Sequence, residues 1–483
     1  KSSCRWFKSA PGHHSAKAAR SMWSLTSLIK PLNIMRNHVF NVEKFKLPSF
    51  QELSGKDLAV VLIVMLAPTF GSLVTFLGCT VGFYFLLQAL FFQKLKAITN
   101  FKVIGWLYLT YCFYFLANGF LNSGVYVTLI SMAPNLPLLL YAFVALVGDW
   151  TDTVIDSKKV GIFCTFGVLI STLVASILFF FPITFEFDGR TLTEHSGVNG
   201  RLSLLAGNPL PFSSMLVCLS FLGLVGYSRK LKVEALLSWL AIIFTGLIIF
   251  FWSESRGSQL TYIALLIVSI LSLSRSKRIS LGTSRLIYIF LSIVLLSGVI
   301  FTISNVKYNE GQDKYFGKIE RIYDGYKQLF VTSSSFHVRD HIDFSVSSRK
   351  LLLATGMETF LSRPVFGYGH DRMYSEVQGR NEFFSDKGYT HLHNSYLNHL
   401  VSGGLLGFFS FISILFLPLW LTRNMSKYSE SRFFALIIFY YSLMSGLTNL
   451  YFNHDLLTSF HGILPLLLAA SLIGDQKVAN EEP

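Results

Sequence analysis

The chain has 483 residues, of which 52% are hydrophobic, 15% are aromatic and only 14% carry a charge. Soluble globular domains carry about 25% charged residues, so this composition excludes an ordinary water-soluble fold and indicates a protein that lies in lipid. The net charge of +14 would suit nucleic acid, but the basic residues fall in short clusters between apolar segments. Such clusters orient membrane proteins, so we exclude nucleic acid as a partner.

Residues 1–56 are polar and basic and precede the first apolar run. They contain no acidic residue before Glu43 and lack the apolar core of a secretory signal peptide. We predict a basic cytoplasmic N-terminal tail. The alternatives are a transit peptide and a true start at Met22 or Met35.

Apolar runs long enough to cross a bilayer recur along the rest of the chain. A hydrocarbon core of about 30 Å needs about 20 helical residues, and a helix satisfies its own backbone hydrogen bonds there. The sequence therefore predicts an all-α polytopic membrane protein with about twelve spans and a short C-terminal cytoplasmic tail over residues 474–483. The expected spans are residues 57–75, 76–93, 103–120, 128–148, 160–182, 209–227, 234–252, 258–274, 285–304, 397–420, 433–452 and 456–473. The first two are separated by a turn at Phe70 and Gly71, and the fourth is interrupted by Pro134 and Pro137.

The lysine and arginine clusters predict the orientation of these spans. With the N-terminus in the cytoplasm, the positive-inside rule is met by the basic clusters within residues 94–102, 158–159, 229–232, 275–285 and 423–432. Two long polar segments, residues 183–208 and 305–396, then lie outside. Most connections in proteins are short, and the second segment holds five histidines and the apolar run 351–360. We expect it to form a folded, largely helical cap.

The centres of the predicted spans contain no Asp, Glu, Lys or Arg. Ion-coupled transporters keep such residues near the bilayer midplane because they carry the proton or bind the ion. This pattern disfavours a glycolipid transporter or flippase, which is the competing hypothesis from another functional class. It favours an enzyme that works on a lipid-linked substrate at the membrane surface.

Arg256 follows the seventh predicted span in the segment Ser253-Glu254-Ser255-Arg256-Gly257. Arginine is uncommon in short outer loops, and its rigid fork of donors matches phosphate oxygens. An ordinary span end, where arginine reaches up to the headgroups, explains the segment equally well.

Arg349 opens the apolar helical run of the long loop, which ends at Arg363-Pro364-Val365-Phe366-Gly367-Tyr368-Gly369. Proline and the two glycines predict a helix end followed by a tight turn. From the residues alone, Arg349 fits a solvated helix start at least as well as a functional site.

His391, His393 and Asn394 immediately precede the tenth span. The two histidines could ligate zinc, but zinc needs a further protein ligand and no spacing supplies one, so we expect no metal. We prefer an imidazole that accepts a hydroxyl proton near neutral pH. Asn394 could orient substrate or cap the next helix.

Two further groups lie on the predicted outer side. Arg201, in the polar segment before the sixth span, is a candidate for binding substrate, as is Glu254. His454 and Asp455 could form an acid–base pair, although a solvated turn is the simpler interpretation.

Taken together and in this order, four motifs resemble the O-antigen ligase and polymerase superfamily. They are Ser-Arg-Gly at Arg256, the arginine at 349, Pro-x-x-Gly-x-Gly at 364–369, and His-Asn-Ser-Tyr-Leu at 393–397 before a Gly-Leu-Leu-Gly segment. The resemblance implies a bacterial inner-membrane glycosyltransferase with an all-helical GT-C-like fold that works at the periplasmic face without cofactor or metal. It also implies catalytic roles for Arg256, Arg349 and His393, with His391 beside the last.

The resemblance further implies an undecaprenyl-diphosphate-linked glycan as donor and an acceptor hydroxyl, with inversion at the anomeric carbon. The chemistry agrees: a diphosphate leaving group needs charge neutralisation, and a sugar hydroxyl needs a base. A ligase, whose acceptor is lipid A core, a polymerase, whose acceptor is another lipid-linked glycan, and a protein O-oligosaccharyltransferase share this donor. The sequence does not separate these three, and we prefer the ligase only slightly.

Overall fold

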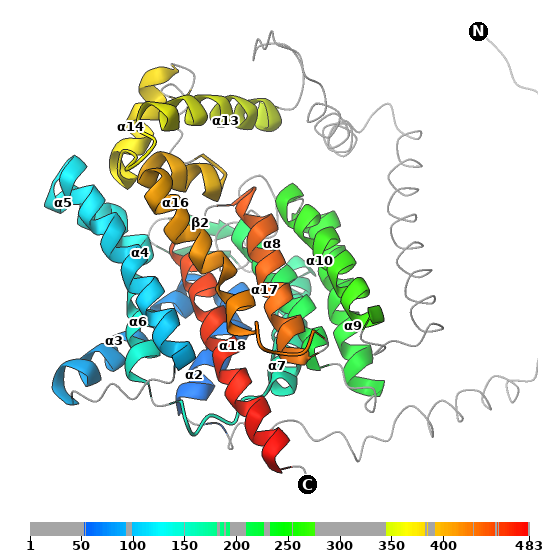
Figure 1. The fold of residues 1–483 in the computed structure, drawn as a ribbon. Helices are drawn as coiled ribbons and strands as arrows, with labels where there is room; N and C mark the ends of the chain where they lie inside the picture. Colours follow the sequence, from blue (N-terminus) through cyan, green and yellow to red (C-terminus); the bar gives the residue numbers. More distant parts are fainter. Residues whose placement is uncertain are drawn as a thin grey trace, which may run out of the picture. The chain divides into compact units, whose positions relative to one another are not determined.

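A computed structural model of the chain describes residues 53, 55–92, 99–148, 150–180, 184–187, 190–193, 209–226, 232–253, 255–275, 344–381, 384, 392–427, 429–449, 452 and 454–481 (Figure 1). Nearly all of the predicted N-terminal tail, the predicted ninth span at 285–304 and the first part of the long loop lie outside these residues.

The described part of the fold is helical apart from one hairpin. Its α-helices are α2 (Gly55–Phe70), α3 (Ser72–Phe92), α4 (Thr99–Ser123), α5 (Val125–Met132), α6 (Leu136–Val147), α7 (Ser157–Phe180), α8 (Pro209–Leu222), α9 (Lys232–Leu247), α10 (Arg256–Arg275), α13 (Phe344–Ser362), α14 (His370–Arg380), α16 (Ser395–Leu421), α17 (Glu430–Gly446) and α18 (Asp455–Glu481). Strands β1 (Thr184–Phe187) and β2 (Arg190–Thr193) pair antiparallel with Thr184 opposite Thr193, within the predicted polar segment 183–208.

The predicted helix breaks are present. Gly71, with a φ of 50°, separates α2 from α3. The 3₁₀ turn Ala133–Asn135, which contains Pro134, separates α5 from α6. Helix α9 continues as a π-helical turn, Ile248–Ser253, that ends just before α10. The apolar run 351–360 lies within α13, as expected.

Six helical segments are long and apolar enough to cross a membrane, so the chain is a polytopic membrane protein, although the expected count of about twelve spans is not established. These segments are Thr99–Ser123, Val125–Val147, Ser157–Ile177, Arg256–Ser274, Ser395–Leu421 and Leu456–Asn480. Shorter apolar helices cover Asp57–Phe70, Leu73–Leu87, Leu210–Val225 and Glu234–Phe250.

Helix α18 forms the centre of the bundle. It is 94% buried over its apolar window, whereas the other long segments are 50–61% buried. It packs against α2, α3, α6, α7 and α17. A helix that is apolar on every side and covered on every side belongs in the core, whereas the half-covered helices leave one face for lipid.

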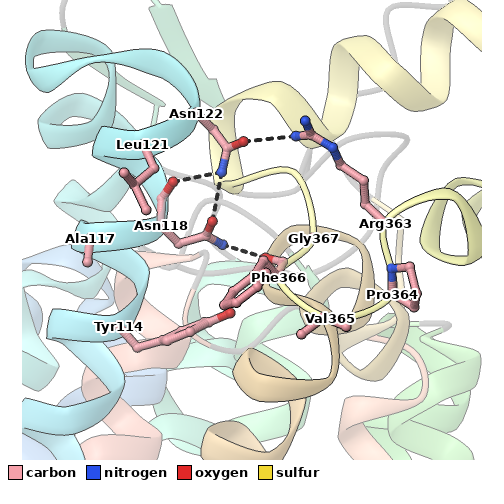
Figure 2. Close-up of a pocket in the computed structure, with 10 residues that line it drawn as sticks. All are labelled: Tyr114, Ala117, Asn118, Leu121, Asn122, Arg363, Pro364, Val365, Phe366 and Gly367. Atoms are coloured by element: carbon pink, nitrogen blue, oxygen red, sulfur yellow. Dashed lines mark hydrogen bonds between the residues drawn. The ribbon is translucent and has the colours of Figure 1, made fainter.

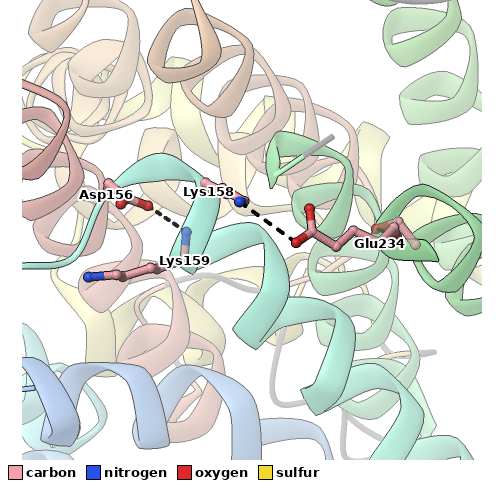
Figure 3. A network of polar contacts seen from close by, with 5 residues as sticks. Asp156, Lys158, Lys159 and Glu234 are labelled. Carbon is pink, nitrogen blue, oxygen red and sulfur yellow. Dashed lines mark hydrogen bonds and ion pairs between the residues drawn. The ribbon is translucent and has the colours of Figure 1, made fainter. Parts of the chain in front are cut away.

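One end of the bundle gathers the helix ends that the charge pattern assigns to the cytoplasm. The Asp475 carboxylate of α18 accepts hydrogen bonds from the Ser157 amide (2.8 Å) and from the Ser431 hydroxyl (2.6 Å). Lys158 lies 3.8 Å from Glu234 (Figure 3). The starts of α7 and α17 therefore meet the last turns of α18, and the start of α9 meets the start of α7.

Candidate functional site

At the opposite end, helix α16 is broken at Gly404, which has φ 60° and ψ −161°. In an unbroken helix the Val401 and Ser402 carbonyls would accept hydrogen bonds from the Leu405 and Leu406 amides. The chain segment that follows α13, residues 363–369, supplies partners for all four groups. We call this segment the inserted turn.

Four backbone hydrogen bonds join the inserted turn to the break. The amides of Tyr368 and Gly369 donate to the carbonyls of Val401 (3.0 Å) and Ser402 (2.8 Å). The amides of Leu405 and Leu406 donate to the carbonyls of Pro364 (2.8 Å) and Val365 (3.3 Å). Two motifs of the sequence thus interlock through backbone groups alone.

The glycines of these motifs are required by close approach. A Cβ on Gly404 would contact the Val365 carbonyl, and a Cβ on Gly367 would lie 2.5 Å from the Gly404 nitrogen. Gly367 and Gly369 have φ of 67° and 82°. The tight turn predicted from Pro364 and the two glycines is confirmed, and it has a specific partner in α16.

Polar side chains of α4 hold the same junction from the other side (Figure 2). Asn118 donates from Nδ2 to the carbonyls of Phe366 (2.8 Å) and Ser402 (3.0 Å). The Tyr114 hydroxyl donates to the Gly403 carbonyl (2.6 Å). The first half of α16 is therefore fixed against both α4 and the inserted turn.

His393 and Asn394 begin α16. Asn394 is the N-cap: its Oδ1 accepts a hydrogen bond from the Leu397 amide (3.0 Å), and its Nδ2 donates to the Leu447 carbonyl (3.4 Å). His393 precedes the cap with a φ of 51°, a backbone conformation that residues other than glycine seldom adopt. The imidazole is half-buried and projects from a fixed helix start.

Arg256 is the first residue of α10, and the start of this helix contacts the same turn as the start of α16. A Cβ on the next residue, Gly257, would contact the Thr448 side chain. Thr448 belongs to the turn after α17 that also binds Asn394 through Leu447. The starts of α10 and α16 therefore flank one turn, residues 447–449.

A network of hydroxyl and amide groups ties a third helix start to this turn. Ser213 of α8 hydrogen-bonds Ser258 of α10 (2.8 Å). Asn449 donates to Ser214 of α8 (3.4 Å), and its carbonyl accepts from Ser395 of α16 (2.7 Å). The N-terminal ends of α8, α10 and α16 converge, and each end carries a partial positive charge that attracts anions.

Arg349 lies in the second turn of α13, which packs on the start of α16. Leu352, one turn further on, belongs to a buried cluster with Leu392 and Leu397. A Cβ on Gly356 would lie 2.6 Å from Leu397. The half-buried Arg349 is thus on the helix that covers the residues on either side of His393.

Comparison with protein families assigns this region. Residues 239–412 match the family model described as O-antigen ligase. The chain carries an O-antigen ligase domain. The match extends from α9 into α16, so it contains the two arginines, His393, the inserted turn and the break in α16. A search among curated proteins finds no match.

The O-antigen ligase domain identifies the chain as a membrane enzyme of lipid-linked glycan transfer. Three of the predicted site residues, Arg201, Glu254 and His391, lie outside the described residues, so their placement stays a prediction. Among the residues that the structure describes, no group of three or more His, Cys, Asp or Glu side chains is arranged to hold a metal ion.

Sequence reasoning missed a buried polar cluster between α4, α14 and α16, whose histidines lie in the O-antigen ligase domain. His399 donates from Nδ1 to the Ser395 carbonyl (2.6 Å), so its Nε2 accepts from the Tyr111 hydroxyl (2.9 Å). His370, the first residue of α14, stacks on Phe115 at 4.5 Å. Burial lowers the pKa of His370 to about 4, so the ring is neutral.

A signal for this cluster was present in the sequence. Ser395, His399 and Ser402 recur at helical spacing along an otherwise apolar segment, which places them on one face of α16. That face lies against α4, where Tyr111 and Asn118 share the same spacing. Polar residues repeated on one face of a membrane helix indicate a polar partner helix.

Proposed function

We propose that the enzyme transfers a glycan from undecaprenyl diphosphate to an acceptor hydroxyl at the periplasmic face of a bacterial inner membrane, with inversion and without a metal. The observation that supports this most directly is the shared position of Arg256 and His393 on two helix starts that flank residues 447–449. This arrangement supports a site that combines an anion-binding group with a proton acceptor.

The leaving group fits the charge of this region. Transfer breaks the bond between the anomeric carbon and a diphosphate oxygen, and the electron pair leaves with the diphosphate. Arg256 and Arg349 would neutralise the charge that develops there, and the N-terminal ends of α8, α10 and α16 would add to the same field. Such fixed donors need no reorganisation during the reaction.

His393 would act on the acceptor. The acceptor oxygen forms the new bond to the anomeric carbon, and its proton passes to the neutral imidazole. Attack on the face opposite the diphosphate inverts the anomeric configuration. Asn394 would be a positioning residue, because it fixes the backbone from which His393 projects without touching the reacting atoms.

The test is transfer by the purified full-length protein, in detergent with EDTA, from an undecaprenyl diphosphate glycan to candidate acceptors. We expect Arg256→Ala and His393→Ala to lose transfer while their thermal stability is retained. His454→Ala changes another histidine near this end of the bundle and should keep transfer. Activity in both Arg256→Ala and His393→Ala would refute the mechanism, and loss of all transfer in EDTA would refute metal independence.

The acceptor decides between the members of the family, and we favour lipid A core. A deletion strain distinguishes the alternatives by its surface polysaccharide. Free unattached polymer is the result expected for a ligase. Surface glycan limited to single repeats would instead identify a polymerase, and unchanged polysaccharide with loss of glycoprotein would identify a protein O-oligosaccharyltransferase.

A further inference from the structure

A pocket of about 550 Å³ lies between α4 and the inserted turn (Figure 2). Most of its lining is apolar: Ala117 and Leu121 come from α4, and Pro364, Val365 and Phe366 come from the turn. Of its polar lining residues, Asn122 and Arg363 lie toward one end, whereas Tyr114 and Asn118 donate to the backbone carbonyls of Gly403, Phe366 and Ser402. The pocket is thus built for a molecule with an apolar body and a polar head.

Two arginines converge on Asn122 at the polar end. Arg363 donates from Nη1 to the Asn122 side-chain oxygen (2.9 Å), and Arg372 donates from Nη1 to the Asn122 carbonyl (3.2 Å). Both hydrogen bonds are exposed at the protein surface, and both acceptor oxygens of Asn122 are uncharged. Asp371, adjacent to Arg372 in the chain, makes no hydrogen bond with either arginine. The pair therefore presents positive charge and spare donors at the mouth of the pocket.

The apolar walls are open to the surroundings of the protein. Leu121 is 87% exposed and Phe366 is 62% exposed, and Tyr126 on the adjoining α5 is 77% exposed. Exposed apolar side chains at the end of a membrane bundle form a surface that suits lipid hydrocarbon. Together with the basic rim, they match the two halves of a phosphate-bearing lipid.

We propose that this pocket binds one lipid with an anionic phosphate headgroup. The phosphate lies between Arg363 and Arg372, and one hydrocarbon chain lies against Leu121 and Phe366. Arginine forks bind phosphate oxygens with charge-assisted hydrogen bonds, and Asn122 fixes the orientation of both guanidinium groups. The site uses none of the residues assigned to glycan transfer, so it stands whether or not the proposed mechanism holds.

The same lipid would also brace the inserted turn. Pro364, Val365 and Phe366 line the pocket, and the carbonyls of Pro364 and Val365 bind the break in α16. A ligand that binds only the assembled turn stabilises it. Occupancy of the pocket would therefore slow amide exchange at Tyr368 and Gly369.

The experiment is native mass spectrometry of the full-length protein, delipidated in detergent and titrated with dioleoyl phosphatidylglycerol. The matched arms are dioleoyl phosphatidylcholine, which has the same chains and no net charge, and inorganic phosphate. Arg363→Gln with Arg372→Gln removes the charge, and Ala117→Phe fills the pocket from α4 without changing the arginines. Arg380→Gln is the control, because among the described residues the Arg380 side chain hydrogen-bonds only the exposed Ser362 hydroxyl (2.6 Å).

We expect one phosphatidylglycerol to bind the wild type and Arg380→Gln alike, with affinity about tenfold lower in Ala117→Phe and in the double variant. If the double variant does not purify as a folded protein, Arg372→Gln alone, which breaks only one exposed bond, carries the charge test. Equal binding of phosphatidylcholine would overturn the anionic headgroup. Displacement by inorganic phosphate alone would overturn a lipid occupant, and equal losses in Arg380→Gln would overturn this location.

Discussion

The break in α16 is the feature whose removal should be most informative. Gly404→Ala adds a Cβ that would contact the Val365 carbonyl and lie 2.6 Å from the Phe366 nitrogen. The φ of 60° and ψ of −161° at Gly404 are also essentially restricted to glycine. The variant must therefore move the inserted turn away, and the alanine backbone at position 404 is strained as well.

The cost follows from the contacts. Strain at such a backbone position is about 1–3 kcal/mol. Each of the four backbone hydrogen bonds across the break contributes about 1 kcal/mol, and displacement of the turn would lose at least two of them. We expect a local destabilisation of about 3–5 kcal/mol, which corresponds to at least about a 100-fold rise in the opening equilibrium of the turn.

Hydrogen exchange followed by mass spectrometry measures this opening in peptides that cover residues 364–370. The matched control is Gly379→Ala in the nearby helix α14, where an added Cβ meets no atom within 4 Å. Alanine there should leave exchange at the turn unchanged and stabilise the helix slightly, by about 0.5–1 kcal/mol. Unchanged exchange in Gly404→Ala, or the same acceleration in Gly379→Ala, would refute the interlock.

Three further predictions concern the helix start, pH and orientation. Asn394→Ala removes a cap, at about 1 kcal/mol, and should lower kcat at least tenfold because His393 loses its fixed support, whereas Ser429→Ala removes the equivalent cap of α17 and should leave kcat unchanged. Burial lowers the pKa of His370 from 6.5 to about 4, so the unfolded chain binds the proton more tightly than the folded chain does. The free energy of unfolding should therefore be constant above pH 6.5 and fall by up to about 3 kcal/mol between pH 6.5 and 4. His370→Phe should reduce this pH dependence in thermal unfolding. Cysteine placed at Gly379, on the predicted periplasmic side, should react with a membrane-impermeant maleimide in cells whose outer membrane is permeabilised. Cysteine at the exposed Asn424, on the predicted cytoplasmic side, should react only after lysis. The reverse pattern would invert the proposed orientation.

Local patterns in the sequence were sufficient for the elements near the site. The apolar run 351–360 predicts α13, and Pro364 with its two glycines predicts the turn that follows it. Asn394 is a residue type that caps helices, and it does cap α16. Each of these features depends on residues within a few positions along the chain, where spacing and side-chain chemistry determine the backbone.

The interlock could not be predicted in the same way. Gly403 and Gly404 indicate only a weak point in a membrane helix, and glycine is common in such helices because it allows close packing. The partner of the break is a turn more than 30 residues earlier, and it is held by backbone groups that every sequence possesses. His370 was missed for a related reason, since nothing in its own segment indicates burial between three helices, whereas the spacing of Ser395, His399 and Ser402 indicates a polar face but does not identify its partner helix.

Backbone hydrogen bonds fix the framework of this domain, and a few side chains are left to carry the proposed chemistry. This explains why the domain combines glycine-rich segments with few charged residues. Catalysis requires groups held within about 0.5 Å of their working positions, and a backbone junction with four hydrogen bonds supplies that rigidity to the first half of α16. In the proposed mechanism the chemistry is carried by His393 and Arg256, at helix starts that flank the turn after α17. A broken membrane helix would ordinarily leave carbonyl and amide groups unpaired in lipid, at a cost of several kcal/mol each. Because the inserted turn pairs all four, the cap and the membrane bundle form one framework, and the position of the proposed base depends on the loop as much as on the span that carries it.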